Sequence, residues 1–264
     1  MVQLNYRVRK GGIPILKDKQ IDEDAEYLLS QYDSTLLTDP HPLDVDDFTE
    51  RFLGFNIHFD NLSNNGCIWG RMVFNNRRIL VYDPEKNDID FHPVDANTVV
   101  IDNSLLDSPN EYALRSTMIH ECGHGLYHGQ IYRENDAQLS FFPVKNEEKI
   151  AITACRSKDI QGNGKRGLVT DHDWIEHHAK YFSAAMLMNR PAMHIVCGNK
   201  ELRKNLRAEV PGFELEYLAS LVSDTFNVSP ASAKIRINQL GYGFEKSEQS
   251  TIFSIGYPSN IISV

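Results

Sequence analysis

The sequence predicts an α+β fold, because helical and strand-like patterns are grouped along the chain instead of alternating. Stretches rich in β-branched and aromatic residues lie between residues 55 and 101. Helical periodicity dominates before residue 54 and again after residue 111. We therefore expect a small mixed sheet flanked by helices, with further helices toward the C-terminus.

Length and composition allow one well-buried domain with an appendage. The 264 residues are 41% hydrophobic and 24% charged, which supports a sizeable core. We expect a folded domain over residues 1–195 and a helical region with a tail over residues 196–264. The net charge of −9 and the pI of about 5.6 give no basic footprint, so we expect no direct binding to nucleic acid.

The sequence favours a cytoplasmic protein that does not associate with membranes. No apolar run approaches the ~20 residues of a membrane span, and the N-terminal stretch MVQLNYRVRKGG contains no apolar core of an export signal. The four cysteines are widely scattered and include no CxxC pair. We expect them to be reduced thiols.

Two helices are expected near the N-terminus. Residues 22–32 and 44–53 carry apolar residues at helical spacing, and Gly54 is a suitable stop for the second helix. Three aspartates lie in the first turn of that helix. They fit the favourable end of the helix dipole better than they fit a metal site.

Four strands and a long irregular segment follow. The expected strands cover residues 55–59, 67–74, 78–82 and 98–101. Asn75 and Asn76 form the predicted hairpin turn between the second and third strands. Residues 130–170 show no strong periodicity, and so long a segment is more often functional than idle. Within it we expect short strands at 141–143 and 150–154 and a flexible loop at 161–165.

A helix is expected between these two regions. Ser108 can cap it, Pro109 suits its first position and Glu111 completes a capping box. Apolar residues then recur at helical spacing as far as Gly129, which we expect to end the helix.

The pattern HExxH lies inside this helix, at His120, Glu121 and His124. Residues four apart on an α-helix point in nearly the same direction, so both imidazoles can bind one Zn²⁺. Glu121 is placed where its carboxylate can take a proton from a water molecule on the metal. The alternative, a core helix with two chance histidines, would bury three polar side chains without a reason.

The next helix begins at a predicted cap, Thr170, and ends before Pro191. Its sequence, DHDWIEHHAKYFSAAMLMN, has one continuous apolar stripe. Further helices are expected at residues 201–210, 213–226 and 231–240, followed by a tail with one short strand at 252–255.

The last two of these helices resemble a helix-turn-helix in length and connection. Lys234 and Arg236 are their only basic residues. With so few cations, an ordinary helical hairpin packed on the core is favoured over a DNA-binding element.

Two histidines leave a zinc site incomplete, because catalytic zinc usually has three protein ligands and one open position. A third histidine six residues after His124 is excluded, since Gln130 stands there. A second known arrangement takes a glutamate from a later helix. Glu176 is the best candidate, because it lies 52 residues after His124 (176 − 124) in a strongly patterned helix.

These two motifs resemble those of the ImmA/IrrE metallo-endopeptidases. HECGHGLYH is similar to the HELGHxxxH pattern of that family, and E-x-x-A-x-x-F-S-A-A-M-L-M is similar to its second motif. The similarity covers roughly residues 20–190, although only these two motifs are specific.

The resemblance implies a cytoplasmic, zincin-like metallopeptidase domain of the gluzincin type over residues 1–195. It implies zinc as the cofactor, with His120, His124 and Glu176 as ligands and Glu121 as the catalytic base. It further implies a protein substrate, namely a helix-turn-helix transcriptional repressor that is cleaved in a stress or mobile-element response.

Lys180 departs from the family pattern, which has Asn or Asp at this position. Because lysine cannot accept a hydrogen bond, another group must orient the histidine ligands. We expect His128 next to a ligand or at the helix end, since a fourth ligand would close the site. The candidates for stabilising an oxyanion are His172, His177, His178, Tyr127 and Tyr181.

Three alternatives remain open at this point. Cys155 could reach the metal as an internal inhibitor, because a thiolate is a strong zinc ligand. The protein could be a zinc-containing regulator that binds DNA or a protein partner without proteolysis. The presence of Glu121 argues against this alternative, because a structural zinc site needs only its ligands. It could also be a general intracellular peptidase.

Overall fold

The computed structural model describes residues 4, 6–9, 12–107, 111–139, 155–156, 168 and 170–244. Several sequence predictions lie outside these residues. They are the cap at 108–110, the strands at 141–143 and 150–154, the loop at 161–165 and the strand at 252–255.

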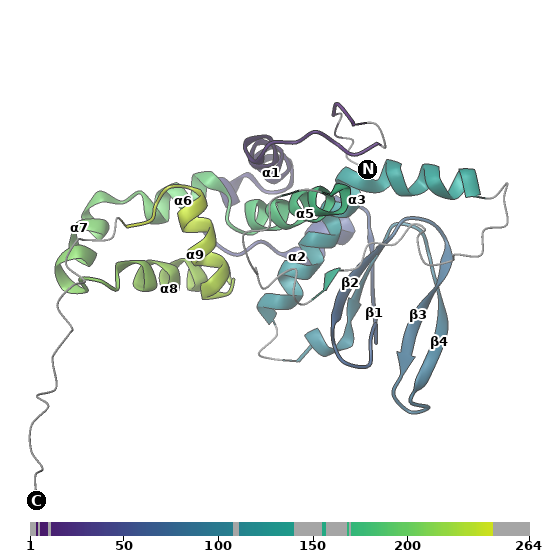
Figure 1. The fold of residues 1–264 in the computed structure, drawn as a ribbon. Helices are drawn as coiled ribbons and strands as arrows, with labels where there is room; N and C mark the ends of the chain where they lie inside the picture. Colours follow the sequence, from purple (N-terminus) through teal and green to yellow (C-terminus); the bar gives the residue numbers. More distant parts are fainter. Residues whose placement is uncertain are drawn as a thin grey trace, which may run out of the picture.

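The fold is α+β, as the grouping of helices and strands predicts (Figure 1). Four strands form a mixed sheet in the order β1-β5-β2-β6. β1 runs parallel to β5, whereas β2 runs antiparallel to both β5 and β6. The strands of this sheet are β1 (Asn56–Asp60), β5 (Thr98–Asp102), β2 (Ile68–Val73) and β6 (Cys155–Arg156).

β5 is one of the two inner strands of the sheet. All five of its residues are buried, and its sequence TVVID is the nearly continuous apolar, β-branched run expected of a strand covered on both faces. Val100 lies opposite His58 of β1 and Arg71 of β2. β5 and β2 both pack against helix α3, so the sheet supports the helix that carries the HExxH motif.

The hairpin predicted at Asn75 and Asn76 is wrong. β3 (Arg77–Asp83) pairs with β4 (Asp88–Val94) in a separate antiparallel sheet, and not with β2. Asn87, in the turn between them, has a positive φ of 52° and so permits the reversal. β4 was missed because most of its positions are exposed and it contains a proline, so it lacks a clear apolar alternation.

The N-terminal helices lie close to their predicted positions. α1 (Asp18–Tyr32) begins one turn earlier than predicted. The second helix starts as α2 (Val45–Asp47), continues as the π-helix η2 (Phe48–Phe52) and ends at Gly54, which has a positive φ of 71°. Its aspartates serve the helix start, since one of them accepts a hydrogen bond from a backbone N–H of the first turn. Two short 3₁₀ helices are η1 (Ser34–Leu37) and η3 (Asn103–Leu105).

α3 (Glu111–Leu139) is longer than predicted, and the stop expected at Gly129 is wrong. Gly129 is buried within the helix. Beyond it, Tyr132 stacks on Phe74, with ring centroids 4.8 Å apart. Packing of the turn that carries Tyr132 therefore outweighs the tendency of glycine to end a helix.

α5 (Asp171–Leu187) begins at the predicted capping box, in which the Asp173 backbone N–H donates to Thr170 Oγ1 at 3.1 Å. The last helix likewise has its predicted cap, Ser229, and Gly241 beyond its end has a positive φ of 76°. The C-terminal helices are α6 (Arg190–Cys197), α7 (Lys200–Glu209), α8 (Glu214–Phe226) and α9 (Pro230–Gln239).

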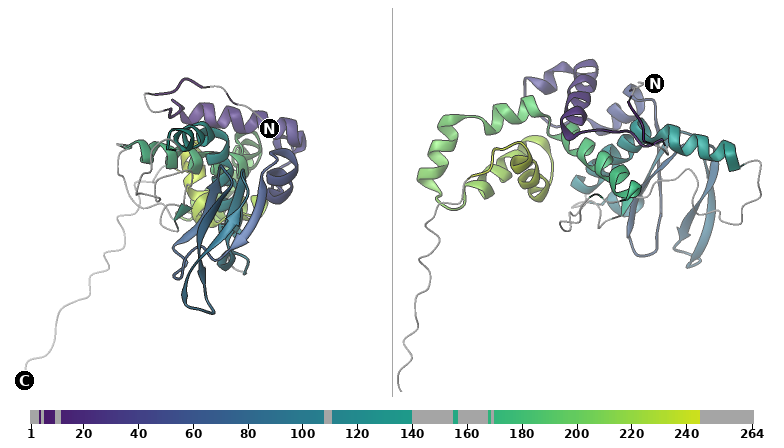
Figure 2. Two further views of the ribbon diagram at one scale, coloured as in Figure 1. Left: turned by 90° about the vertical axis from the view of Figure 1, so that its right-hand side faces the viewer. Right: turned by 45° about the horizontal axis from the view of Figure 1, so that its top comes forward.

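One main hydrophobic core connects α1, α3 and α5 with α8 and α9. Figures 1 and 2 show α6–α9 at one end of the molecule and the β3–β4 sheet at the other. Residue 195, the expected domain boundary, lies within α6. Among the helices that the structure describes, none combines the length and the apolar content that a bilayer crossing requires.

A buried ion pair fastens α9 to the N-terminal helix α1. Arg236 is fully buried, and its Nη2 donates to Asp22 Oδ1 at 2.5 Å. Its Nε donates to the Met188 carbonyl at 3.1 Å, and Tyr181 donates to the other carboxylate oxygen of Asp22 at 2.9 Å. Arg236, one of the two basic residues of the helical hairpin, therefore forms an ion pair inside the protein and is not exposed for contact with DNA.

We expect Asp22→Ala to destabilise the protein by about 3–5 kcal/mol, because it leaves the Arg236 charge buried without its partner. The control is Glu216→Ala, which removes the exposed partner of Lys234, 3.0 Å away on the same helical hairpin. It should change the free energy of unfolding far less. Urea unfolding measures both, and equal losses would contradict the role assigned to Asp22.

Candidate metal centre

Two helices from distant parts of the chain meet at the candidate site. α3 carries the HExxH residues and α5 carries Glu176. Gly123 of α3 faces α5: a Cβ at this position would lie 3.1 Å from Ala179 Cα, which is closer than an ordinary van der Waals contact. The small residues at the contact let the two backbones approach, and this brings the ligand candidates together.

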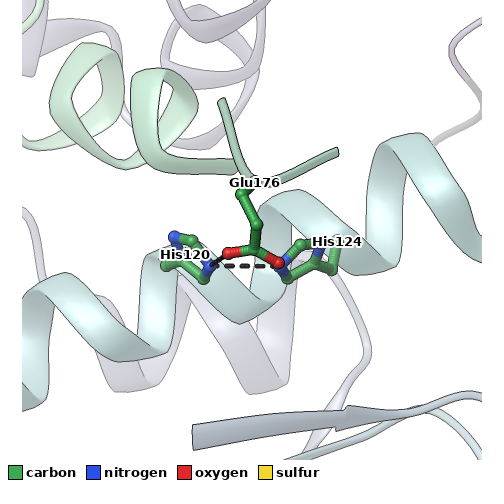
Figure 3. Close-up of side chains that lie close together, drawn as sticks. All are labelled: His120, His124 and Glu176. Atoms are coloured by element: carbon green, nitrogen blue, oxygen red, sulfur yellow. Dashed lines mark hydrogen bonds and ion pairs between the residues drawn. The ribbon is translucent and has the colours of Figure 1, made fainter. Parts of the chain in front are cut away.

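The structure places His120, His124 and Glu176 side by side (Figure 3). The two Nε2 atoms lie 3.0 Å apart. Glu176 Oε2 lies 3.4 Å from His120 Nε2, and Glu176 Oε1 lies 3.5 Å from His124 Nε2. Within the described part of the chain, these are the only three His, Cys, Asp or Glu residues whose ligand atoms all lie within 4.8 Å of one another.

This spacing fits a zinc ion. Two ligand atoms that each lie roughly 2.1 Å from one ion, at the tetrahedral angle, are roughly 3.4 Å apart. The two Nε2 atoms lie 3.0 Å apart, and each of them has one oxygen of the Glu176 carboxylate 3.4 or 3.5 Å away. In addition, Glu176 Oε2 is buried and forms no hydrogen bond with the described residues, a costly state for a carboxylate without a cation.

A chain of imidazoles leads from the site into the protein. His124 Nδ1 lies 3.1 Å from His128 Nδ1, and His128 Nε2 lies 3.4 Å from His178 Nδ1. If Nε2 of His124 is left unprotonated for a metal, its Nδ1–H donates to His128, whose Nε2–H then faces His178. His128 can therefore orient the His124 ring, a role that Lys180 cannot fill because lysine accepts no hydrogen bond. His128 lies inside α3 and not at its end.

Burial keeps these rings neutral. The pKa of His124 and that of His128 lie well below the usual range, first because both rings are buried and then because other imidazoles surround them. Burial also lowers the pKa of His178 to about 4. Neutral imidazole is the form that binds zinc, so His124 needs to lose no proton before binding a metal at neutral pH.

Glu121 is buried between α3 and the sheet. A Cβ on Gly70 of β2 would lie 3.2 Å from Glu121 Oε1 and 2.5 Å from Thr117 Cγ2. Glycine at this point of β2 therefore leaves space for the Glu121 side chain. Glu121 is not among the three residues of the ligand group.

Both tyrosines that the sequence offered for oxyanion stabilisation are bonded elsewhere. Tyr127 donates to Asp24 at 3.1 Å, and Tyr181 donates to Asp22 at 2.9 Å. Their hydroxyl groups hold α1 against α3 and α5 instead of facing the three ligand candidates.

Two of the histidine candidates have other surroundings. His177 Nε2 lies 2.7 Å from Asp18, whereas the exposed His172 has its Nδ1 3.9 Å from Glu176 Oε1. The backbone of Cys155 belongs to β6, but its side chain lies outside the described part of the structure. A role of this thiol as an internal inhibitor stays a prediction.

Tyr132 is a candidate that sequence reasoning missed. It continues the series of residues spaced by four along α3 and lies one turn beyond His128. Burial raises the pKa of Tyr132 to about 12, and the charges of Glu176 and Glu121 add to the rise. Its phenol stays protonated and can donate a hydrogen bond. The periodicity was visible in the sequence, but the predicted stop at Gly129 cut it off.

The sequence matches no protein-family model, and it has no significant match among curated proteins. Its function is therefore inferred from the geometry of the site and from the two sequence motifs.

We expect His120→Ala, His124→Ala and Glu176→Ala each to lose most bound zinc, because each removes one of three ligands. His172→Ala and His177→Ala are the matched controls, and both should retain about one zinc per chain. Metal analysis after purification in zinc measures all five. A Glu176→Ala variant that keeps its zinc would refute the third ligand.

We expect Gly123→Val to weaken zinc binding by about ten-fold or more, because the added methyl groups push α5 and its glutamate away from α3. Cys122→Val is the control: it places the same β-branched residue at the neighbouring position of the same helix, where the native sulfur lies 3.3 Å from Thr49 Oγ1. Zinc affinity is measured by competition with a chelating dye. Equal affinities of the two variants would show that the helix contact does not set the site.

Proposed function

We propose that the protein is a zinc-dependent endopeptidase with a zincin-like catalytic domain of the gluzincin type. One observation carries the proposal: His120, His124 and Glu176 converge, with Glu121 next to them and outside the ligand group. Two histidines on one helix, a glutamate from another and a neighbouring carboxylate form the set that hydrolytic zinc sites use. The resemblance of both motifs to the ImmA/IrrE metallo-endopeptidases supports the same assignment.

Zinc, when bound, would polarise the scissile carbonyl and lower the pKa of a water molecule toward ~7. Glu121 would accept a proton from the water that attacks the carbonyl carbon. It would then deliver that proton to the amide nitrogen as the C–N bond breaks.

The sheet offers an extended peptide a place to bind. β6 is the outer strand of the described sheet, and its partner β2 meets Glu121 at Gly70. An edge strand can hold a peptide by main-chain hydrogen bonds whatever its side chains are. A substrate in this position would run alongside the residues that carry out the chemistry.

A zinc-containing regulator without proteolysis is the weaker candidate. Such a protein needs the ligands alone, whereas here a further carboxylate, Glu121, is buried at a cost. DNA binding by α8 and α9 has little support, because Arg236 is buried and Lys234 pairs with Glu216.

We further propose that the substrate is a helix-turn-helix transcriptional repressor and that cleavage takes place in the cytoplasm. This part depends on the resemblance to the ImmA/IrrE family. A general intracellular peptidase is the alternative, and the two differ in the range of proteins they cut. A dedicated protease uses contacts remote from the scissile bond to position a single target.

We expect Glu121→Gln to retain about one zinc per chain but to lose turnover by roughly 10²–10⁴-fold, because the variant cannot accept the proton. Glu50→Gln, exposed on η2, is the control and should keep full activity. The assay compares helix-turn-helix repressors encoded beside the protein with unfolded casein. We expect one cut in one repressor and almost none in casein.

Two results would count against these assignments. A Glu121→Gln variant that purifies without zinc would make Glu121 a ligand instead of a base. Robust digestion of casein by the wild type would refute the dedicated protease while leaving the endopeptidase in place.

A further inference from the structure

A cavity of about 270 Å³ opens directly beside the candidate metal centre, and His120 forms part of its wall. α5 contributes Ala184 and Leu187 to the lining, while Val228 and Ile235 come from the α8–α9 connection and from α9. The cavity therefore lies between the two ligand-bearing helices and the C-terminal helical hairpin.

The closed side of the cavity is apolar. Leu187, Met188 and Val228 belong to its lining and are 3%, 1% and 1% exposed. Ile235 is 45% exposed and stands at the mouth. An occupant that enters past Ile235 meets hydrocarbon on the inner side.

Several polar side chains of the lining are already bonded to the protein. Ser183 Oγ donates to the Ser116 carbonyl at 3.0 Å, and the Ser229 and Ser232 hydroxyls are bonded at 2.9 Å. Tyr181 donates to a carboxylate of α1 at 2.9 Å. Lys180 and Gln239 also line the cavity, but most of its surface is apolar, so recognition comes from burial of apolar surface more than from hydrogen bonds.

The volume limits the occupant. Sites for drug-sized ligands measure roughly 300–1,000 Å³, so a cavity of about 270 Å³ lies just below that range. It suits one large side chain better than a cofactor or a stretch of peptide.

We propose that this cavity selects the substrate by accepting one large apolar side chain, such as leucine, methionine or phenylalanine, from a residue that flanks the scissile bond. Because His120 is both a ligand candidate and a wall, a side chain in the cavity places its own backbone beside the metal centre. The inference rests on the proposed endopeptidase function and names the specificity of that same site.

The C-terminal helices are thereby part of substrate recognition. Arg236 follows Ile235 on α9 and is held by Met188 and Asp22, at 3.1 and 2.5 Å. This attachment fixes the α9 wall against the end of α5. A wall that is already in place needs no ordering when a side chain binds, which favours affinity.

The test uses the zinc-loaded full chain and a peptide library that varies the residues on both sides of the cut. We expect kcat/KM with leucine at one flanking position to exceed that with alanine by about ten-fold or more. Ile235→Trp and Ala184→Leu fill the cavity from opposite walls. Each should reduce this preference by about ten-fold and leave the zinc content unchanged.

Ile195→Trp is the matched control, because Ile195 is exposed on α6 and does not line the cavity. It should leave the preference as it is in the wild type. Equal cleavage beside leucine and alanine, or a preference that neither filling variant alters, would overturn the pocket while the endopeptidase stands.

Failure of the proposed function gives a different result, in which the zinc-loaded protein cuts no peptide at all. In that case the cavity is tested by ligand binding, which is measured as saturation transfer from the protein to N-acetyl-L-leucinamide. Signal with wild type and Ile195→Trp but not with Ile235→Trp supports an apolar pocket. Absence of signal with the wild type overturns it.

Discussion

The candidate site depends on how closely α3 and α5 approach each other. At their contact Gly123 faces Ala179, and a methyl group on the glycine would crowd the backbone of α5. His120 and His124 lie on either side of this glycine, and Glu176 lies one turn before Ala179. A single contact between small residues therefore sets the positions of three side chains at once, although they come from distant parts of the chain.

Burial around this contact shapes the chemistry of the site. It keeps His124 and His128 neutral, and it leaves a Glu176 oxygen without a hydrogen bond from the described residues. Neutral imidazoles and a carboxylate are the ligand types that a zinc ion prefers, which is why we propose a metal at this place. A metal bound to the folded state alone would also stabilise the fold, so that the site and the helix crossing support each other.

The C-terminal helices belong to the same core as the site. Arg236 of α9 reaches Asp22 of α1 and the Met188 carbonyl at the end of α5, which joins three segments far apart in the sequence. The same attachment positions Ile235 at the mouth of the cavity beside His120. A region that the sequence presents as an appendage thus completes the surroundings of the candidate metal centre.

The sequence by itself named Glu176 as the third ligand candidate, although its place beside the two histidines follows from the contact between α3 and α5. It determined the local features, namely the spacing of HExxH on a helix and the capping box at Thr170. These depend on periodicity and on contacts within a few residues, which a linear pattern records. Only the tertiary structure decided that α3 continues past Gly129, that β3 pairs with β4, that His128 orients a ligand candidate, and that Arg236 is buried. Each of these depends on packing between distant segments, which outweighs local preference.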